Sequence, residues 1–131
     1  MTSRTLAKKI AQFALFKKAY DVTIMDLRKL TDMTDFFVIC SADSDVQVKA
    51  IADAVMEGTE KLGADVWHRE GLSQRQWVLL DYVDVVVHIF NKELRRFYSL
   101  EKLWGDAKVE CVEDKEVKKK TTRKAKAVII T

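Results

Sequence analysis

Apolar residues recur at helical spacing in two stretches of the chain. In residues 4–19 and again in residues 45–62 they mark one face of an amphipathic helix. Ser44 and Gln47 have the form of a capping box at the start of the second stretch. Gly63 stands where helices commonly end in left-handed backbone. The pattern therefore predicts two helices, over 4–19 and 45–62.

Shorter segments have the alternating or continuous apolar character of strands. The middle of residues 35–41 is a continuous apolar run, which indicates a strand buried on both faces. We expect five strands, at 21–27, 35–41, 64–68, 76–81 and 85–90. A tight turn at 82–84 would join the last two strands, and a short helix capped by Asn91 and a turn over 100–104 would follow.

This order of elements predicts a single α/β domain with a mixed five-stranded sheet flanked by helices. The helix over 45–62 can cross over and make the strands on either side of it a parallel pair, while the last hairpin is antiparallel. Because successive side chains of a strand point to opposite faces, Trp77 and Leu79 should face away from Val78 and Leu80.

Charge is distributed unevenly along the 131 residues. Residues 108–131 hold eight Lys and Arg against four Asp and Glu, whereas residues 1–107 hold fifteen against sixteen. We therefore expect a folded domain over 1–107 and a basic, disordered tail over 108–131. The nearly neutral body argues against a domain that grips a nucleic-acid backbone by charge.

The residue content also bears on location. No apolar run approaches the roughly 20 residues that a membrane helix needs. The polar start of the chain lacks the continuous apolar stretch of a secretory signal. Cys40 and Cys111 fit neither a disulfide framework nor a zinc motif. We expect a cytoplasmic protein.

Catalytic and metal chemistry find little support in the residue spacing. Cys40 could pair with His68 or His88, but a buried free cysteine more often acts as a small hydrophobe. The two histidines lie on different expected strands and have no second ligand at metal spacing, so we expect no metal ion.

Nucleotide chemistry is the one enzymatic alternative that stays open. Asp81 and Asp84 flank the turn of the last hairpin and could hold magnesium, as in nucleotidyl transfer. The four glycines never cluster into a phosphate-binding loop, however, and aspartate is a common turn residue. We therefore favour a protein with no catalytic residues and no cofactor.

A binding surface is the remaining possibility. Aromatic residues are concentrated late in the body and arginines lie among them, at Trp77, Tyr82, Phe97, Tyr98, Trp104, Arg75, Arg95 and Arg96. These residue types carry many protein–protein contacts, although any single aromatic can equally serve the core.

Several segments resemble, in order and at the expected spacing, the ribosomal silencing factor (RsfS/Iojap) family. In the first half these are residues 34–41 and 47–53, and in the second half residues 77–82, 84–90 and 98–107. The resemblance covers about residues 4–107. It implies a fold related to nucleotidyltransferases, without their catalytic apparatus.

The resemblance also implies a function. Such a factor binds a large-subunit ribosomal protein, the fourteenth by family naming (uL14 type), on the face that meets the small subunit. It thereby blocks subunit joining and represses translation. Carried over residue by residue, the contact would involve Trp77, Leu79, Asp81, Tyr82, Tyr98 and Trp104.

The chain departs from the family pattern in a few places. Ala42 and Asp43 replace a usual Gly-Thr, and Val46 replaces a common arginine. Val83 stands where a glycine is usual, which leaves the turn type open because valine disfavours positive φ. A weak contact of the tail with ribosomal RNA, an RNA-binding module led by the tail, and a homodimer of the free protein also stay open.

Overall fold

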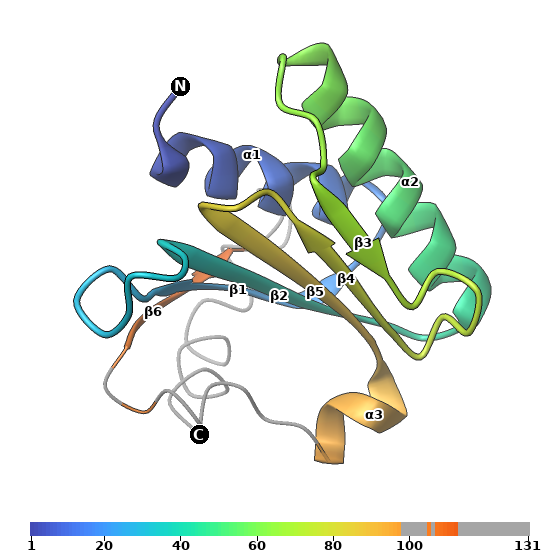
Figure 1. The fold of residues 1–131 in the computed structure, drawn as a ribbon. Helices are drawn as coiled ribbons and strands as arrows, with labels where there is room; N and C mark the ends of the chain where they lie inside the picture. Colours follow the sequence, from blue (N-terminus) through green and yellow to red (C-terminus); the bar gives the residue numbers. More distant parts are fainter. Residues whose placement is uncertain (98–104, 106, 113–131) are drawn as a thin grey trace.

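The computed structural model describes residues 1–97, 105 and 107–112. Within them the chain forms three helices and six strands: α1 (Ser3–Phe16), β1 (Tyr20–Asp26), β2 (Phe36–Ala42), α2 (Asp45–Lys61), β3 (His68–Glu70), β4 (Trp77–Asp81), β5 (Val85–Asn91), α3 (Lys92–Phe97) and β6 (Lys108–Val112). The strands make one sheet in the order β3-β4-β5-β2-β1-β6. Figure 1 shows α1 and α2 on one face of this sheet and α3 on the other.

The sheet is mixed, as predicted. Strands β2 and β5 pair in parallel, with Val38 opposite Val87, and the other neighbouring strands pair antiparallel. The expected hairpin of β4 and β5 is present, with Leu79 opposite His88. Helix α2 connects β2 to β3 along the chain, but β2 and β3 are not neighbours in the sheet. The predicted parallel pairing of residues 35–41 with 64–68 was therefore wrong.

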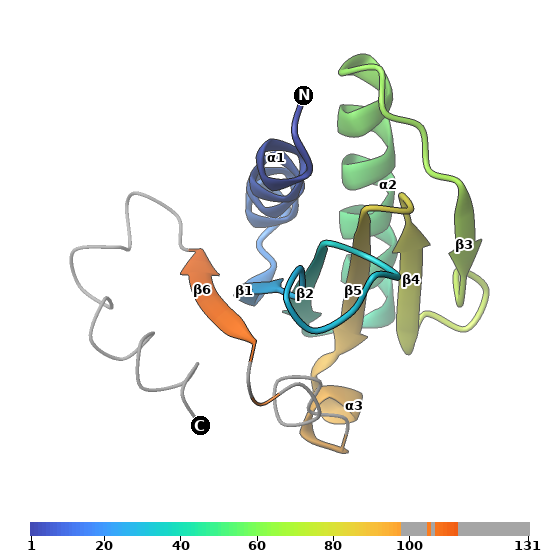
Figure 2. The ribbon, with the colours of Figure 1, turned by 60° about the vertical axis from the view of Figure 1, so that its left-hand side comes forward.

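Two strands differ from the expectation. The third strand runs over 68–70 rather than 64–68, and all three of its residues are exposed. A sixth strand, β6, occupies residues 108–112, where a disordered tail was predicted, so the domain extends past residue 107. It pairs antiparallel with β1 and places Val109 opposite Met25. Figure 2 shows β3 and β6 at opposite edges of the sheet.

Alternation along the strands divides the buried side chains into two groups. Facing α1 and α2 is a large cluster of aliphatic side chains, to which Val78, Leu80 and Ile89 belong. We call this side of the sheet the α1/α2 face. The opposite side, the α3 face, has a smaller buried cluster of Met25, Leu27, Ile39 and Phe90.

Helix α2 begins and ends as the sequence indicated. The Ser44 hydroxyl accepts a hydrogen bond from the Gln47 amide at 3.2 Å, and Gly63 adopts a φ of +83° just after the helix. The Gln47 side chain does not close the capping box on Ser44. Its Oε1 accepts from the Asp43 amide instead, at 2.7 Å, and its Nε2 donates to the Lys18 carbonyl, at 2.9 Å.

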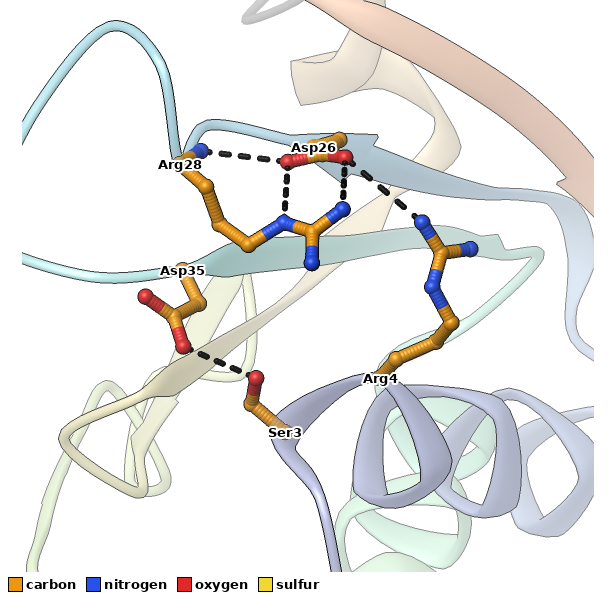
Figure 3. Close-up of polar contacts among 5 residues, drawn as sticks. All are labelled: Ser3, Arg4, Asp26, Arg28 and Asp35. Carbon is orange, nitrogen blue, oxygen red and sulfur yellow. Dashed lines mark hydrogen bonds and ion pairs between the residues drawn. The ribbon is translucent and has the colours of Figure 1, made fainter.

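Polar contacts hold the start of α1 against the sheet (Figure 3). The Ser3 hydroxyl donates to Asp35 at 2.8 Å, and Arg4 lies 3.6 Å from the Asp26 carboxylate. Arg28 donates to both oxygens of Asp26, at 3.0 and 2.7 Å. These hydrogen bonds hold the pKa of Asp26 low, at about 2. Among the described residues, no helix is long and apolar enough to cross a membrane.

Candidate functional site: the α3 face of strands β4 and β5

Three of the six predicted contact residues share the α3 face. Trp77, Leu79 and Asp81 alternate along β4 with the fully buried Val78 and Leu80, and each is half-buried. This confirms the predicted separation of Trp77 and Leu79 from Val78 and Leu80. In the pairing of β4 with β5, Trp77 lies opposite Phe90 and Leu79 lies opposite His88.

The indole of Trp77 is held by side chains of β5. Its Nε1–H donates a hydrogen bond to Nδ1 of His88 at 3.1 Å. The Trp77 ring also packs on Phe90, with ring centroids 4.8 Å apart, and Phe37 meets the His88 ring edge-on at 4.5 Å. An indole with its N–H satisfied and its ring packed presents a defined surface at little entropic cost.

His88 is a buried, neutral histidine. Only 4% of its surface is exposed, and burial, with a smaller effect of the Arg95 charge, lowers its pKa to about 4. Because Nδ1 accepts from Trp77, the ring proton of the neutral form must sit on Nε2. That Nε2 is buried and has no hydrogen-bond partner among the described residues. No sequence pattern indicated that His88 is the acceptor for Trp77.

Tyr82 lies on the other side of the sheet. It is 8% exposed and packs with the α1/α2 cluster, and its hydroxyl is 2.8 Å from the Thr59 hydroxyl of α2. Burial raises the pKa of Tyr82. The expectation that Tyr82 contributes to binding rather than to fold stability does not fit this position, so we omit it from the contact surface. Tyr98 and Trp104 lie outside the described residues.

The hairpin that carries Asp81 has a strained turn. Val83 has a φ of 73°, and the Asp84 amide donates to the Tyr82 carbonyl at 2.9 Å. A hydrogen bond over two residues with positive φ between them is the pattern of a classic γ-turn, which is rare. The Asp81 carboxylate supports the turn by accepting from the Val83 amide at 2.7 Å. Asp81 therefore acts as a turn residue, as the sequence favoured over a magnesium site.

The other candidate groups for chemistry are not brought together. Cys40 is fully buried in the α1/α2 cluster, and burial raises its pKa to about 12. His88 points to the opposite face, and His68 is on β3, beyond β4. No three His, Cys, Asp or Glu side chains group around a metal-sized space in the part of the chain that is described.

Trp67 was missed by the sequence reasoning. It precedes β3, is 71% exposed, and is therefore much more accessible than Trp77. A single tryptophan in a short polar-flanked segment carries no periodic signal, so only its position in the fold shows that it is on the surface.

Comparison with known proteins gives a consistent result. The family described as "Ribosomal silencing factor during starvation" matches residues 1–129, which extends past the 4–107 span of the resemblance. "Ribosomal silencing factor RsfS" of Bacillus subtilis (strain 168) is 40% identical over 107 residues, covering 82% of this chain and 91% of that protein. "Protein Iojap, chloroplastic" of Zea mays is 37% identical and covers 79% of this chain and 45% of that protein.

Solved structures agree with the fold. A crystal structure of a protein from Chromobacterium violaceum has a TM-score of 0.78 and 32% identity, and covers 87% of this chain and 95% of that one. One from Bacillus halodurans has a TM-score of 0.71 and 38% identity, and covers 77% and 94%. By its sequence over almost the full length, this chain belongs to the ribosomal silencing factor (RsfS) family.

Proposed function

We propose that this protein binds a large-subunit ribosomal protein of the uL14 type through the α3 face of β4 and sterically blocks subunit joining. The observation that carries the proposal is the placement of Trp77, Leu79 and Asp81 on one face, half-buried, beside the hydrogen bond that fixes Trp77. Family membership supplies the ribosome as the target.

The mechanism needs no substrate, cofactor or metal ion. A factor seated on the inter-subunit face occupies space that the small subunit requires, and this by itself represses translation. An interface of about 1,600 Å² in total is enough for stable binding when a few aromatic anchors are well packed. Trp77 supplies such an anchor, Leu79 adds apolar area, and Asp81 adds one negative charge at the edge.

The same face could also pair two copies of the free protein. Burying it in a homodimer would compete with ribosome binding, because both use Trp77 and Leu79. Analytical ultracentrifugation of the wild type and of Leu79→Glu separates the two uses. A dimer that Leu79→Glu dissociates would support this arrangement.

Co-sedimentation with isolated large subunits tests the proposed contact. Trp77→Ala and Leu79→Glu should each prevent pelleting while the circular dichroism spectrum stays that of the wild type. Phe16→Ala is the matched control, since Phe16 is a 77% exposed aromatic at the end of α1. Undiminished pelleting of folded Trp77→Ala and Leu79→Glu would overturn the proposal.

A further inference from the structure

Two large apolar side chains are exposed together at the turn end of β4. Trp67 is 71% exposed and Val83 is 54% exposed. Asp81 links them, because its carbonyl accepts from the Trp67 amide at 2.8 Å and its carboxylate accepts from the Val83 amide at 2.7 Å. Asp81 therefore ties the backbone of both exposed residues to the turn end of β4.

The conformation of Val83 is a second and independent observation. A β-branched residue with a φ of 73° is strained by about 1–3 kcal/mol. Its side chain is exposed at the turn, so burial of this side chain does little to offset the strain. Strained residues cluster at binding and catalytic sites, and Val83 is a candidate for such a role.

Acidic residues stand close to both exposed side chains. Asp65 and Asp84 are exposed, and burial together with a smaller effect of the Asp65 charge raises the pKa of Tyr82. No lysine or arginine occurs between residues 76 and 91. Arg69, two residues from Trp67, directs its guanidinium to the Met56 sulfur, at 3.5 Å. Arg4 and Arg28 both form ion pairs with Asp26.

We propose that this surface, made of Asp65, Trp67, Val83 and Asp84 and called here the hairpin-end surface, binds a basic segment of protein that also carries apolar side chains. Asp81 of the α3 face accepts hydrogen bonds from the amides of Trp67 and Val83, so the hairpin-end surface adjoins that face. The segment is therefore part of the same ribosomal protein that the α3 face contacts, and the inference rests on the proposed function in this respect.

Protein fits the surface better than RNA does. A nucleic acid would bring phosphates next to the exposed carboxylates of Asp65 and Asp84. Phosphate contacts depend on lysine and arginine, and residues 76–91 contain neither. A lysine- or arginine-bearing segment would instead gain charge complementarity while its apolar groups cover Trp67 and Val83. Tryptophan is among the residues most often found as an interface anchor.

Binding of the purified uL14-type protein to the full chain, followed by calorimetry, tests the inference. Trp67→Ala should weaken binding by about 10- to 30-fold, the loss expected for a moderate to strong anchor. Trp67→Phe should recover part of the affinity, and Phe16→Ala should bind as the wild type does. Asp65→Lys should weaken binding further as the salt concentration is lowered, because like charges then repel more strongly.

Val83→Gly separates binding from folding. Glycine adopts positive φ without strain, so this variant should unfold at a higher urea concentration than the wild type. It also lacks the apolar side chain, so it should bind several-fold more weakly. A variant that is both more stable and a weaker binder is not expected if Val83 is only a turn residue. Unchanged affinity would count against the inference.

Trp77→Ala in the same experiment shows which claim has failed. If Trp77→Ala loses binding while Trp67→Ala, Val83→Gly and Asp65→Lys all bind normally, the hairpin-end surface is not a contact and the proposed function stands. If none of the four variants loses binding, the proposed function itself is wrong. If Trp67→Ala loses affinity for ribosomal RNA fragments but not for the protein, the partner chemistry assigned here is wrong.

Discussion

The α1/α2 face and the α3 face of one sheet differ in where aromatic rings and polar groups meet. Against α1 and α2 the strands present aliphatic residues such as Val38 and Leu80, which are fully buried. Toward α3, beside the apolar Met25, Leu27 and Ile39, they also present the rings of Trp77, Phe90 and His88, with a hydrogen bond between Trp77 and His88. Aliphatic packing stabilises without directional preference, whereas oriented aromatics with polar groups suit recognition. We therefore expect stability to depend on the first face and binding on the second.

Adjacent leucines of β4 give the largest expected difference between the faces. Leu80 is fully buried, and Leu80→Ala should lower the free energy of unfolding by about 2–5 kcal/mol. Leu79 is half-buried, so Leu79→Ala should lower the free energy of unfolding by only about 1 kcal/mol, because less apolar area leaves water on folding. Urea denaturation followed by circular dichroism measures both. Equal losses would contradict the division of roles.

His88 should make the fold sensitive to mild acid. Its pKa falls from 6.5 to about 4 on folding, so the unfolded chain binds more protons between these values. The stability that neutral His88 contributes is complete above about pH 7 and is lost as the pH drops towards 4, by about 3 kcal/mol. Urea midpoints measured from pH 7.5 to 4 should show this slope. His88→Leu should remove most of it, and an unchanged slope would place the acid sensitivity elsewhere.

Tyr82 should behave as a core residue despite its place beside the contact strand. Tyr82→Phe removes the hydrogen bond with Thr59 and should lower the free energy of unfolding by about 1 kcal/mol. Pelleting with large subunits should be unchanged. Weaker pelleting at wild-type stability would return Tyr82 to the contact surface.

The smallest effect is expected from the charged end of the chain. Truncation after Val112 keeps β6 and removes seven Lys and Arg against three Asp and Glu. Binding to large subunits should remain, but its dependence on salt should become shallower if these residues meet ribosomal RNA. Parallel salt curves for the full and truncated chains would show that they do not.

Helix α2 and strand β5 could be predicted because their signals are local. A cap, a periodic apolar face and a terminal glycine define α2, and a continuous apolar run defines β5. Strands β3 and β6 lie at the two edges of the sheet and lack this support. The residues of β3 are all exposed, and charged residues interrupt the apolar positions of β6. Whether these segments form strands therefore depends on pairing partners that are distant in sequence.

The site could be predicted in part for the same reason. Alternation along β4 separates Trp77 and Leu79 from the core, and it equally places Tyr82 with Val78 and Leu80, as the structure does. The resemblance grouped Tyr82 with Trp77 because both match the same motif of the family. The acceptor role of His88 and the exposure of Trp67 depend on packing between strands, which no local pattern reveals.

A subunit-joining assay tests the central claim most directly. Large subunits would be preincubated with the protein and mixed with small subunits, and joined ribosomes would be measured on sucrose gradients, with and without added nucleotide. The account predicts that joined ribosomes decrease in proportion to bound factor, independently of nucleotide, and that Leu79→Glu has no such effect. Full joining in the presence of saturating, bound wild-type protein would contradict it.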